Sequence, residues 1–269
     1  MTDPRLASLA EQAEGLRALH QGSVPLILAN VWDVASATAV ERAGSAAIAT
    51  TSSGVAASLG FPDGEGMPAA EMLAAIGRIA AAVSVPVTAD MESGYGLEAH
   101  PLVDGLLGAG AVGLNLEDTD RSGEVPGLVD IDRQVERLAA VRRAATDAGV
   151  PIVINARIDV FLVSRTPLED LLADAIRRAQ AYVGGGAECV FPIWLAEADA
   201  IGRFVRGVDA PVNILLRPGS PPIDALARLG VRRISVGGGL ARHALDATEA
   251  IARRLLAGDG APFVELGES

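Results

Sequence analysis

Eight short apolar segments, each followed by a longer stretch of helical periodicity, run along the 269-residue chain. They are rich in Val and Ile and lack internal charges, as strands buried on both faces of a parallel sheet do. We expect these strands at residues 24–30, 46–51, 85–90, 112–117, 152–157, 188–192, 212–216 and 233–236. The helices are expected at residues 34–43, 69–83, 100–108, 131–148, 167–183, 196–206, 222–229 and 241–256, with a leading helix over 2–20.

This alternation predicts an α/β fold, a single (β/α)8 TIM barrel preceded by one extra helix. One barrel domain would account for residues 1–269, with its core at about 20–256. Glycine and proline mark the turns from helix to strand, as at Gly149 and Pro151. An open doubly wound sheet is the alternative. That fold usually has a glycine-rich phosphate loop after its first strand, and residues 30–33 contain no glycine.

The composition excludes several kinds of chemistry. The chain contains no lysine, since all 22 of its basic residues are arginine, so lysine-dependent aldolases and pyridoxal phosphate enzymes are excluded. The net charge of −12 argues against nucleic acid and acidic membranes as partners, because phosphate binding needs a basic surface. The single cysteine, Cys189, excludes a disulfide framework and a cysteine-rich metal site.

The chain shows no targeting or membrane segment. Residues 1–21 carry charges of both signs and lack the basic start and apolar stretch of a signal peptide. No run of about 18 uncharged apolar residues occurs that could form a transmembrane helix. With a free cysteine and an acidic surface, we therefore expect a soluble, cytoplasmic protein.

Acidic side chains lie at the ends of the third and fourth expected strands. In a TIM barrel the catalytic groups sit at the carboxyl ends of the strands, so Asp90, Glu92 and Glu117 should converge there. Carboxylate oxygens with retained waters suit Mg²⁺ or Mn²⁺. The alternative is that these carboxylates only cap the helices that follow.

Other polar residues at the same edge are candidates for substrate binding. Arg157 ends an apolar strand, where a permanent charge needs either a substrate carboxylate or an ion pair with Asp159 or Glu117. The hydroxyls and turn N–H groups of residues 51–54 could hold a carboxylate, or form an ordinary turn. Asn213 in the seventh strand is a further substrate-binding candidate.

Two loops could close over this site. Asp63 lies in the long loop after the second strand, in a Pro-Asp-Gly sequence that is also typical of a plain turn. Residues 118–130 form a polar loop with glycine and proline, which is either a lid that excludes water or a disordered surface loop.

Six stretches together resemble the isocitrate lyase/phosphoenolpyruvate mutase superfamily. They occur in the family's order and spacing across residues 20–256 and read TTSSGVAASLGFPDG (50–64), VTADMESGYG (87–96), GLNLEDT (113–119), INARIDVFL (154–162), AECVFP (187–192) and PVNILLRPGSP (211–221). The resemblance implies a barrel whose last helix is often swapped between subunits of dimers and tetramers. Homodimers or homotetramers are therefore expected.

The resemblance also implies roles for the candidate residues. Mg²⁺ would be held by Asp90, Glu92 and Glu117, partly through water, with a 2-oxo or 2-hydroxy carboxylate chelating it. In family terms Thr51, Ser52 and Ser53 would hold the substrate carboxylate and Arg157 the oxygen that becomes the enolate. Asp63 would be the loop aspartate that closes on the site.

The chain departs from the lyases of the family in its lid. Those enzymes carry a Cys-containing acid/base motif after the fourth strand, whereas this chain has Thr119-Asp120-Arg121-Ser122-Gly123. We expect a divergent member, a Mg²⁺-dependent carbon–carbon lyase or decarboxylase acting on a small 2-hydroxy or 2-oxo (di)carboxylate through a pyruvate-like enolate. The alternatives are P–C chemistry of the phosphonopyruvate hydrolase or phosphoenolpyruvate mutase kind, and a 2-oxo-acid-binding barrel with little activity.

Overall fold

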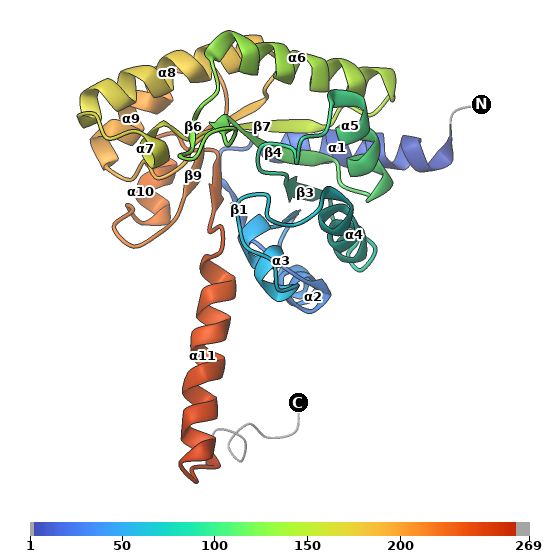
Figure 1. Ribbon diagram of the computed structural model, residues 1–269, viewed down its shortest axis with the longest axis vertical. Helices are drawn as coiled ribbons and strands as arrows, with labels where there is room; N and C mark the ends of the chain where they lie inside the picture. Colours follow the sequence, from blue (N-terminus) through green and yellow to red (C-terminus); the bar gives the residue numbers. More distant parts are fainter. Residues whose placement is uncertain (1–2, 262–269) are drawn as a thin grey trace.

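The computed structural model describes residues 3–261 and contains the expected eight parallel strands, arranged as a barrel (Figure 1). They are β1 (Leu26–Leu28), β2 (Ile48–Ala49), β3 (Val87–Asp90), β4 (Gly113–Glu117), β7 (Val153–Ile158), β8 (Cys189–Pro192), β9 (Asn213–Leu215) and β10 (Arg233–Ser235). Each lies inside or within one residue of a predicted segment, so the prediction of an α/β barrel is confirmed.

Hydrogen bonding runs almost continuously around the barrel. One parallel sheet has the order β2-β3-β4-β7-β8 and the other the order β1-β10-β9. Single parallel bridges join them, Val31 to Thr50 on one side and Val190 to Val212 on the other. The register places Asp90 beside Asn115 and Glu117 beside Arg157. Side chains at neighbouring strand ends therefore face the same mouth of the barrel.

The described residues form eleven helices, of which all but the last lie around the strands. They are α1 (Pro4–Leu19), α2 (Val34–Arg42), α3 (Ser52–Ser58), α4 (Ala69–Ala80), α5 (Ala99–Gly108), α6 (Ile131–Asp147), α7 (Val160–Val163), α8 (Leu168–Gly184), α9 (Ala198–Arg206), α10 (Ile223–Arg228) and α11 (Gly239–Leu256). The short helices α3 and α7 were not predicted. None of the described helices combines the length and apolar character that crossing a membrane requires.

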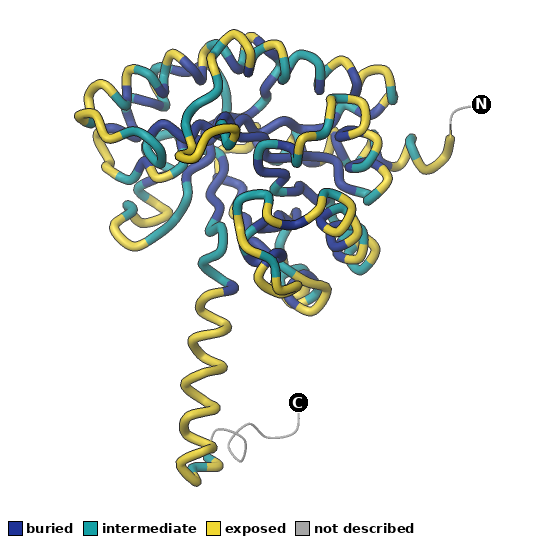
Figure 2. The backbone as a smooth tube through the Cα atoms, in the orientation of Figure 1, coloured by how far each residue is buried: buried dark blue, intermediate teal, exposed yellow. Residues whose placement is uncertain are grey.

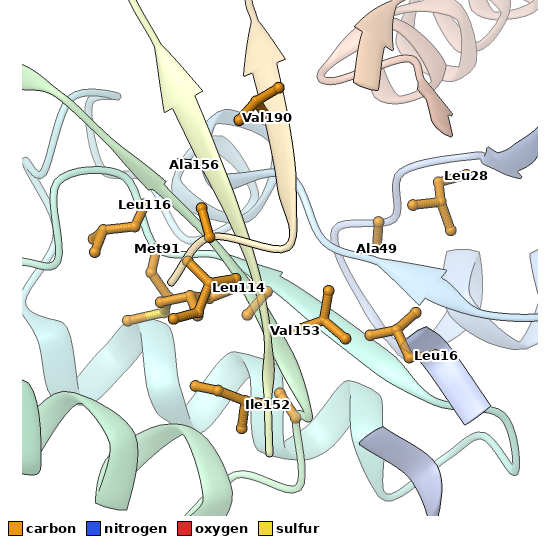
Figure 3. Close-up of a cluster of buried hydrophobic side chains, with 14 of the residues drawn as sticks. Leu16, Leu28, Ala49, Met91, Leu114, Leu116, Ile152, Val153, Ala156 and Val190 are labelled. Atoms are coloured by element: carbon orange, nitrogen blue, oxygen red, sulfur yellow. The ribbon is translucent and has the colours of Figure 1, made fainter. Parts of the chain in front are cut away.

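The core is built mainly from Ala, Val, Leu and Ile. Figure 3 shows part of it: Leu114, Leu116 and Ala156 lie on one face of the adjacent strands β4 and β7, and Val153 lies on the opposite face. The leading helix α1 packs Leu16 onto these strands, and a Cβ on Gly113 would lie 2.8 Å from Leu16 Cδ2. Glycine at this position therefore allows α1 to approach the barrel closely.

The loop at residues 118–130 is ordered as a small antiparallel hairpin. Its strands are β5 (Thr119–Asp120) and β6 (Gly127–Leu128), which pair with each other. The backbone N–H of Val129 donates to the carbonyl of Asp118 at 2.9 Å, which closes the base of the loop. The hairpin was not predicted, and it gives the lid a defined position over the barrel mouth (Figure 1).

The last helix, α11, leaves the barrel instead of packing against it. Figures 1 and 2 show it projecting away from the strands with exposed residues along its length. Its apolar side chains face solvent, with 65% of Leu245 and 89% of Leu256 exposed. Exposed leucines on one long helix are typical of a surface that another polypeptide covers.

A buried histidine under the barrel predicts acid-sensitive stability. His20 Nδ1 donates to Leu16 O at 2.8 Å, and its Nε2 lies 3.4 Å from Arg233 NH1. Burial and then this cation lower the pKa of His20 to about 4. In the unfolded chain His20 takes up a proton near pH 6.5, whereas in the folded chain it does so only near pH 4. Between these values the unfolded chain holds more protons, so the free energy of unfolding decreases as the pH is lowered. This group alone should remove roughly 2 kcal/mol between pH 7.5 and pH 5.

Urea unfolding of the wild type and of His20→Gln at pH 7.5 and pH 5 measures this effect. The wild type should lose about 2 kcal/mol more than the variant on going to pH 5. The buried carboxylates with raised pKa values shift stability in the opposite direction in both proteins, so they cancel in the comparison. Equal losses in the two proteins would show that His20 is not held neutral.

Candidate active site

A cavity of about 950 Å³ opens at the carboxyl ends of the strands. The polar residues predicted for the site that line it are Thr51, Ser52, Ser53, Asp63, Asp90, Glu92 and Arg157. Its other walls include Phe191, Ile193, Leu215 and Leu216, which are apolar. The barrel therefore places one mixed polar and apolar cavity where a TIM barrel carries out its chemistry.

Asp90 is held in one orientation by the chain that follows β2. Its Oδ2 accepts from the backbone N–H of Ser52 at 3.0 Å and from Ser52 Oγ at 2.8 Å. Its own N–H donates to Thr50 Oγ1 at 2.9 Å. Ser52 is thus engaged with Asp90, while the hydroxyls of Thr51 and Ser53 lie 3.1 Å apart on the cavity wall.

Glu92 is a buried carboxylate with a raised pKa. It stands at φ 46°, in the left-handed region, and it accepts from Tyr95 OH at 2.7 Å. Burial raises its pKa to about 7, and the negative charges of Asp90 and Asp63 add to the rise. Strained backbone at a non-glycine residue is found preferentially at functional sites.

Glu117 and Arg157 form a buried ion pair at the end of two adjacent strands. Arg157 NH1 lies 2.7 Å from Glu117 Oε2, and its Nε and NH2 donate to the two oxygens of Asp159 at 2.7 and 2.8 Å. Burial raises the pKa of Glu117 to about 8, against the lowering effect of Arg157. The ion-pair reading of Arg157 is therefore correct, although its side chain also reaches the cavity.

Asp159 is oriented by the carboxylate of Asp118, which accepts from its backbone N–H. The N–H of Asp159 donates to Asp118 Oδ1 at 2.8 Å, and Asp118 Oδ2 accepts from Tyr182 OH at 2.7 Å and Arg178 NH1 at 3.0 Å. Asp118 is fully buried, and burial raises its pKa to about 6. This network fixes Asp159, which in turn fixes the plane of the Arg157 guanidinium.

Arg121 of the lid is a site residue that sequence reasoning missed. Its NH1 lies 2.6 Å from Glu117 Oε1 and its NH2 lies 3.5 Å from Glu92 Oε2. It also lines the cavity. The only available signal was the presence of an arginine in a lid where the lyases of the family have other residues.

Of the two remaining predicted residues, Asp63 lines the cavity and Asn213 does not. Asp63 lines the cavity from the loop between α3 and α4 and is close enough to raise the pKa of Glu92. Asn213 does not line the cavity. It is fully buried at the start of β9, where it donates to Ser235 Oγ at 3.2 Å. The structure therefore does not bring Asn213 to the substrate side of the barrel.

The three candidate metal ligands do not surround one point in this conformation. Within residues 3–261, no three His, Cys, Asp or Glu side chains are close enough to share a metal ion. The donor chemistry nevertheless suits Mg²⁺, because both oxygens of Glu117 are buried and accept no hydrogen bond beyond their arginine ion pairs. Arg121 contacts two of the three carboxylates, so it must move for a cation to reach them.

The single cysteine lies away from the lid. Cys189 is buried in β8, and burial raises the pKa of its thiol to about 12. A thiol in this environment stays protonated near neutral pH and is not a nucleophile or a base. Within the described residues the site has no thiol that could replace the acid/base cysteine of the lyases.

Comparisons with known proteins agree with this geometry. The family model for phosphoenolpyruvate phosphomutase matches residues 16–256. The 2-methylisocitrate lyase of Escherichia coli K12 is 34% identical over 76% of this chain and 70% of its own length.

Solved structures share the fold. A putative phosphonomutase from Burkholderia cenocepacia superposes with a TM-score of 0.85 and is 40% identical over 90% of this chain and 99% of its own. A phosphonopyruvate hydrolase solved with oxalate and Mg²⁺ has the same fold, with a TM-score of 0.83 at 24% identity over 96% of this chain and 91% of its own. The chain is an enzyme that belongs to the phosphoenolpyruvate phosphomutase family, within the isocitrate lyase/phosphoenolpyruvate mutase superfamily of lyases and mutases.

Proposed function

We propose that this protein is a Mg²⁺-dependent (or Mn²⁺-dependent) lyase or decarboxylase that breaks a carbon–carbon bond in a small 2-oxo or 2-hydroxy carboxylate. The observation that carries the proposal is the position of Arg157. Its guanidinium is held by Glu117 and Asp159 and lines the same cavity as Asp90, which is itself held by Ser52. A preorganised cation at that place stabilises negative charge that develops on an enolate oxygen.

The residues of the chain divide the work as follows. Arg157 binds and orients the oxygen that becomes the enolate. Thr51 and Ser53 hold the neighbouring carboxylate through hydroxyl groups on the cavity wall. Asp90, Glu92 and Glu117 would hold Mg²⁺, which supplies Lewis-acid stabilisation of the same charge when bound. Asp63 and the lid at residues 118–130 exclude water from the cavity.

The lack of a lid acid favours decarboxylation within this class. Cleavage of a 2-hydroxy acid requires a base to remove the hydroxyl proton and an acid to protonate the departing carbanion. Decarboxylation of a 2-oxo acid that carries a second carboxylate on C3, as oxaloacetate does, releases that carboxylate as CO₂ with no proton to remove. The bonding pair moves into the 2-oxo group, and the resulting enolate then takes one proton. The Cys189 thiol is buried and stays protonated near neutral pH, so it cannot serve as the acid/base group. A reaction that depends less on acid/base groups therefore suits the site better.

Turnover measurements with Mg²⁺ test the proposal directly. Oxaloacetate, methylisocitrate, dimethylmalate and isocitrate are offered in turn, and pyruvate or the corresponding cleavage product is measured with and without EDTA. We expect Mg²⁺-dependent turnover of at least one of them, with oxaloacetate the first to try. Absence of turnover with all four would exclude the carbon–carbon reading.

P–C bond chemistry on phosphonopyruvate is the second candidate. It also proceeds through a pyruvate-like enolate, which Arg157 could stabilise in the same way. The lack of a thiol in the described lid counts against the lyases that use a lid cysteine and therefore favours this alternative. Phosphorus NMR on phosphonopyruvate separates the two, since only P–C chemistry gives inorganic phosphate or a phosphate ester. Binding of a 2-oxo acid without turnover would instead give a ligand-dependent rise in melting temperature and no product.

We also propose that the chain forms a homodimer or homotetramer through α11. Leu245 and Leu256 are exposed and lie eleven residues apart, about three helical turns, so they share one face of the helix. Replacing both with glutamate is expected to convert the assembly to a monomer in light scattering. Ala247→Glu/Ala250→Glu alters the opposite face and should keep the assembly. A monomeric wild type at micromolar concentration would contradict the proposal.

A further inference from the structure

The cavity is lined by a further cationic group besides Arg121 and Arg157. Arg217, on the loop after β9, lines the cavity, and its guanidinium carbon lies 4.6 Å from the centre of the Trp194 ring. Its NH2 donates to the carbonyl of Trp194 at 3.0 Å. Stacking on an aromatic ring and a bond to a fixed carbonyl restrict a side chain that is otherwise flexible.

The charge of Arg217 has no partner in the described part of the chain. No carboxylate there forms an ion pair with it, in contrast to Arg157 and Arg121, which pair with Glu117. Its Nε is buried and has no hydrogen-bond partner. Arg242, at the start of α11, also lines the cavity without an ion pair within residues 3–261. Buried donors are normally satisfied, so an unpaired one beside a cavity points to a ligand.

The backbone at Trp194 is strained in a way that supports this placement. Trp194 has φ 70°, a left-handed conformation that L side chains rarely adopt, and the residue is 43% exposed and lines the cavity. In this conformation its carbonyl accepts from Arg217 NH2. Strain of this kind persists where the surroundings enforce it, and it is concentrated at ligand sites.

The cations that line the cavity therefore differ in their pairing. Arg121 and Arg157 pair with carboxylates, whereas Arg217 and Arg242 line the same cavity without an ion pair within residues 3–261, among apolar residues such as Phe191 and Leu216. A ligand with a single carboxylate at Arg157 leaves Arg217 unpaired. A ligand with two anionic ends, one at Arg157 and one at Arg217, satisfies both.

We propose that Arg217 is a specificity-determining residue that binds the second carboxylate of the substrate, with Trp194 as its positioning residue. The substrate class is accordingly a dicarboxylate of about four carbons or more with a 2-oxo or 2-hydroxy group. This inference rests on the proposed function, which places the reacting end at Arg157. It adds that a monocarboxylate such as pyruvate is bound as a product and not as a substrate.

Calorimetric titration with two stable probes in the presence of Mg²⁺ tests it. Oxalate occupies the reacting end alone, whereas malate has a second carboxylate that can reach Arg217. Arg217→Gln is expected to weaken malate binding by about 10–100-fold and to change oxalate binding by no more than about twofold. Arg217→Lys, which keeps the charge and loses the planar fork, should recover part of the malate affinity.

Arg228→Gln is the matched control, because Arg228 is exposed on α10 and pairs with Asp224 away from the cavity. It should leave both affinities unchanged. Equal loss of both probes in Arg217→Gln, or an unchanged malate affinity, would overturn the assignment of Arg217 while the proposed function stands. A wild type that binds malate no better than Arg217→Gln does would also overturn it. Failure of the wild type to bind oxalate would remove the reacting-end site and with it both proposals.

Discussion

Substitution of Arg157 by glutamine is expected to lower kcat by about 10³-fold on whichever carboxylate the turnover screen identifies. The guanidinium is a permanent cation that lines the cavity and is fixed by strand-end carboxylates, through two bonds to Asp159 and one ion pair to Glu117. Glutamine keeps much of the length of the side chain and some hydrogen bonding but supplies no charge. The loss should therefore appear in kcat more than in KM, because enolate charge exists only after substrate is bound.

The same substitution also changes the ionisation of its neighbours. Arg157 is the largest factor that lowers the pKa of Glu117, which burial already raises to about 8. Without it, Glu117 should be protonated over a wider pH range. Arg157→Lys should recover part of kcat, since it restores the charge without the fork to Asp159. Arg177→Gln, at an exposed position of α8, is the control. A kcat within tenfold of wild type in Arg157→Gln would show that charge stabilisation lies elsewhere.

The strand-end residues could be predicted because the geometry of a parallel barrel leaves little freedom. Once β3, β4 and β7 are recognised as adjacent parallel strands, Asp90, Glu117 and Arg157 must lie at the same mouth. Short apolar segments that alternate with helical stretches predict those strands, so the position of each strand end can be predicted from the local sequence. The fold and the floor of the site follow from that pattern.

The residues that were missed belong to loops and to side-chain orientation. Arg121 pairs with Glu117 from a loop that forms a hairpin, and Arg217 lines the cavity from the loop after β9, where it stacks on Trp194. Neither conformation has a periodic signature in the sequence. Asn213 was misplaced for a related reason, since its position at the start of β9 and not at its end directs it into the barrel interior.

The projecting helix shows another limit of sequence reasoning. The periodicity of residues 241–256 correctly predicts a helix, now α11 (Gly239–Leu256). Periodicity does not state which molecule covers the apolar face. In the structure Leu245 and Leu256 contact solvent instead of the barrel, so the partner of that face is a property of the assembly and not of the local sequence.

Asp90→Asn is expected to weaken Mg²⁺ binding by roughly 10²-fold or more, seen as loss of the Mg²⁺-dependent rise in melting temperature. Asparagine keeps the size of the side chain and can still accept from Ser52 through its one oxygen. Its NH2 replaces the second oxygen, so the long 3.4 Å bond from Asn115 Nδ2 is lost together with the charge. Asp199→Asn, on the exposed start of α9, removes a charge far from the cavity and should retain the full Mg²⁺ response.

Without Mg²⁺, the Asp90→Asn variant should not be less stable than the wild type. The negative charge of Asp90 raises the pKa of both Glu92 and Glu117, which means that the three carboxylates repel one another when no cation is bound. Asp90→Asn relieves this repulsion, so without Mg²⁺ the variant should be at least as stable as the wild type and should lose only the response to the metal. A variant destabilised in EDTA but still stabilised by Mg²⁺ would show instead that Asp90 serves the fold through Ser52 and that the cation is held by other groups.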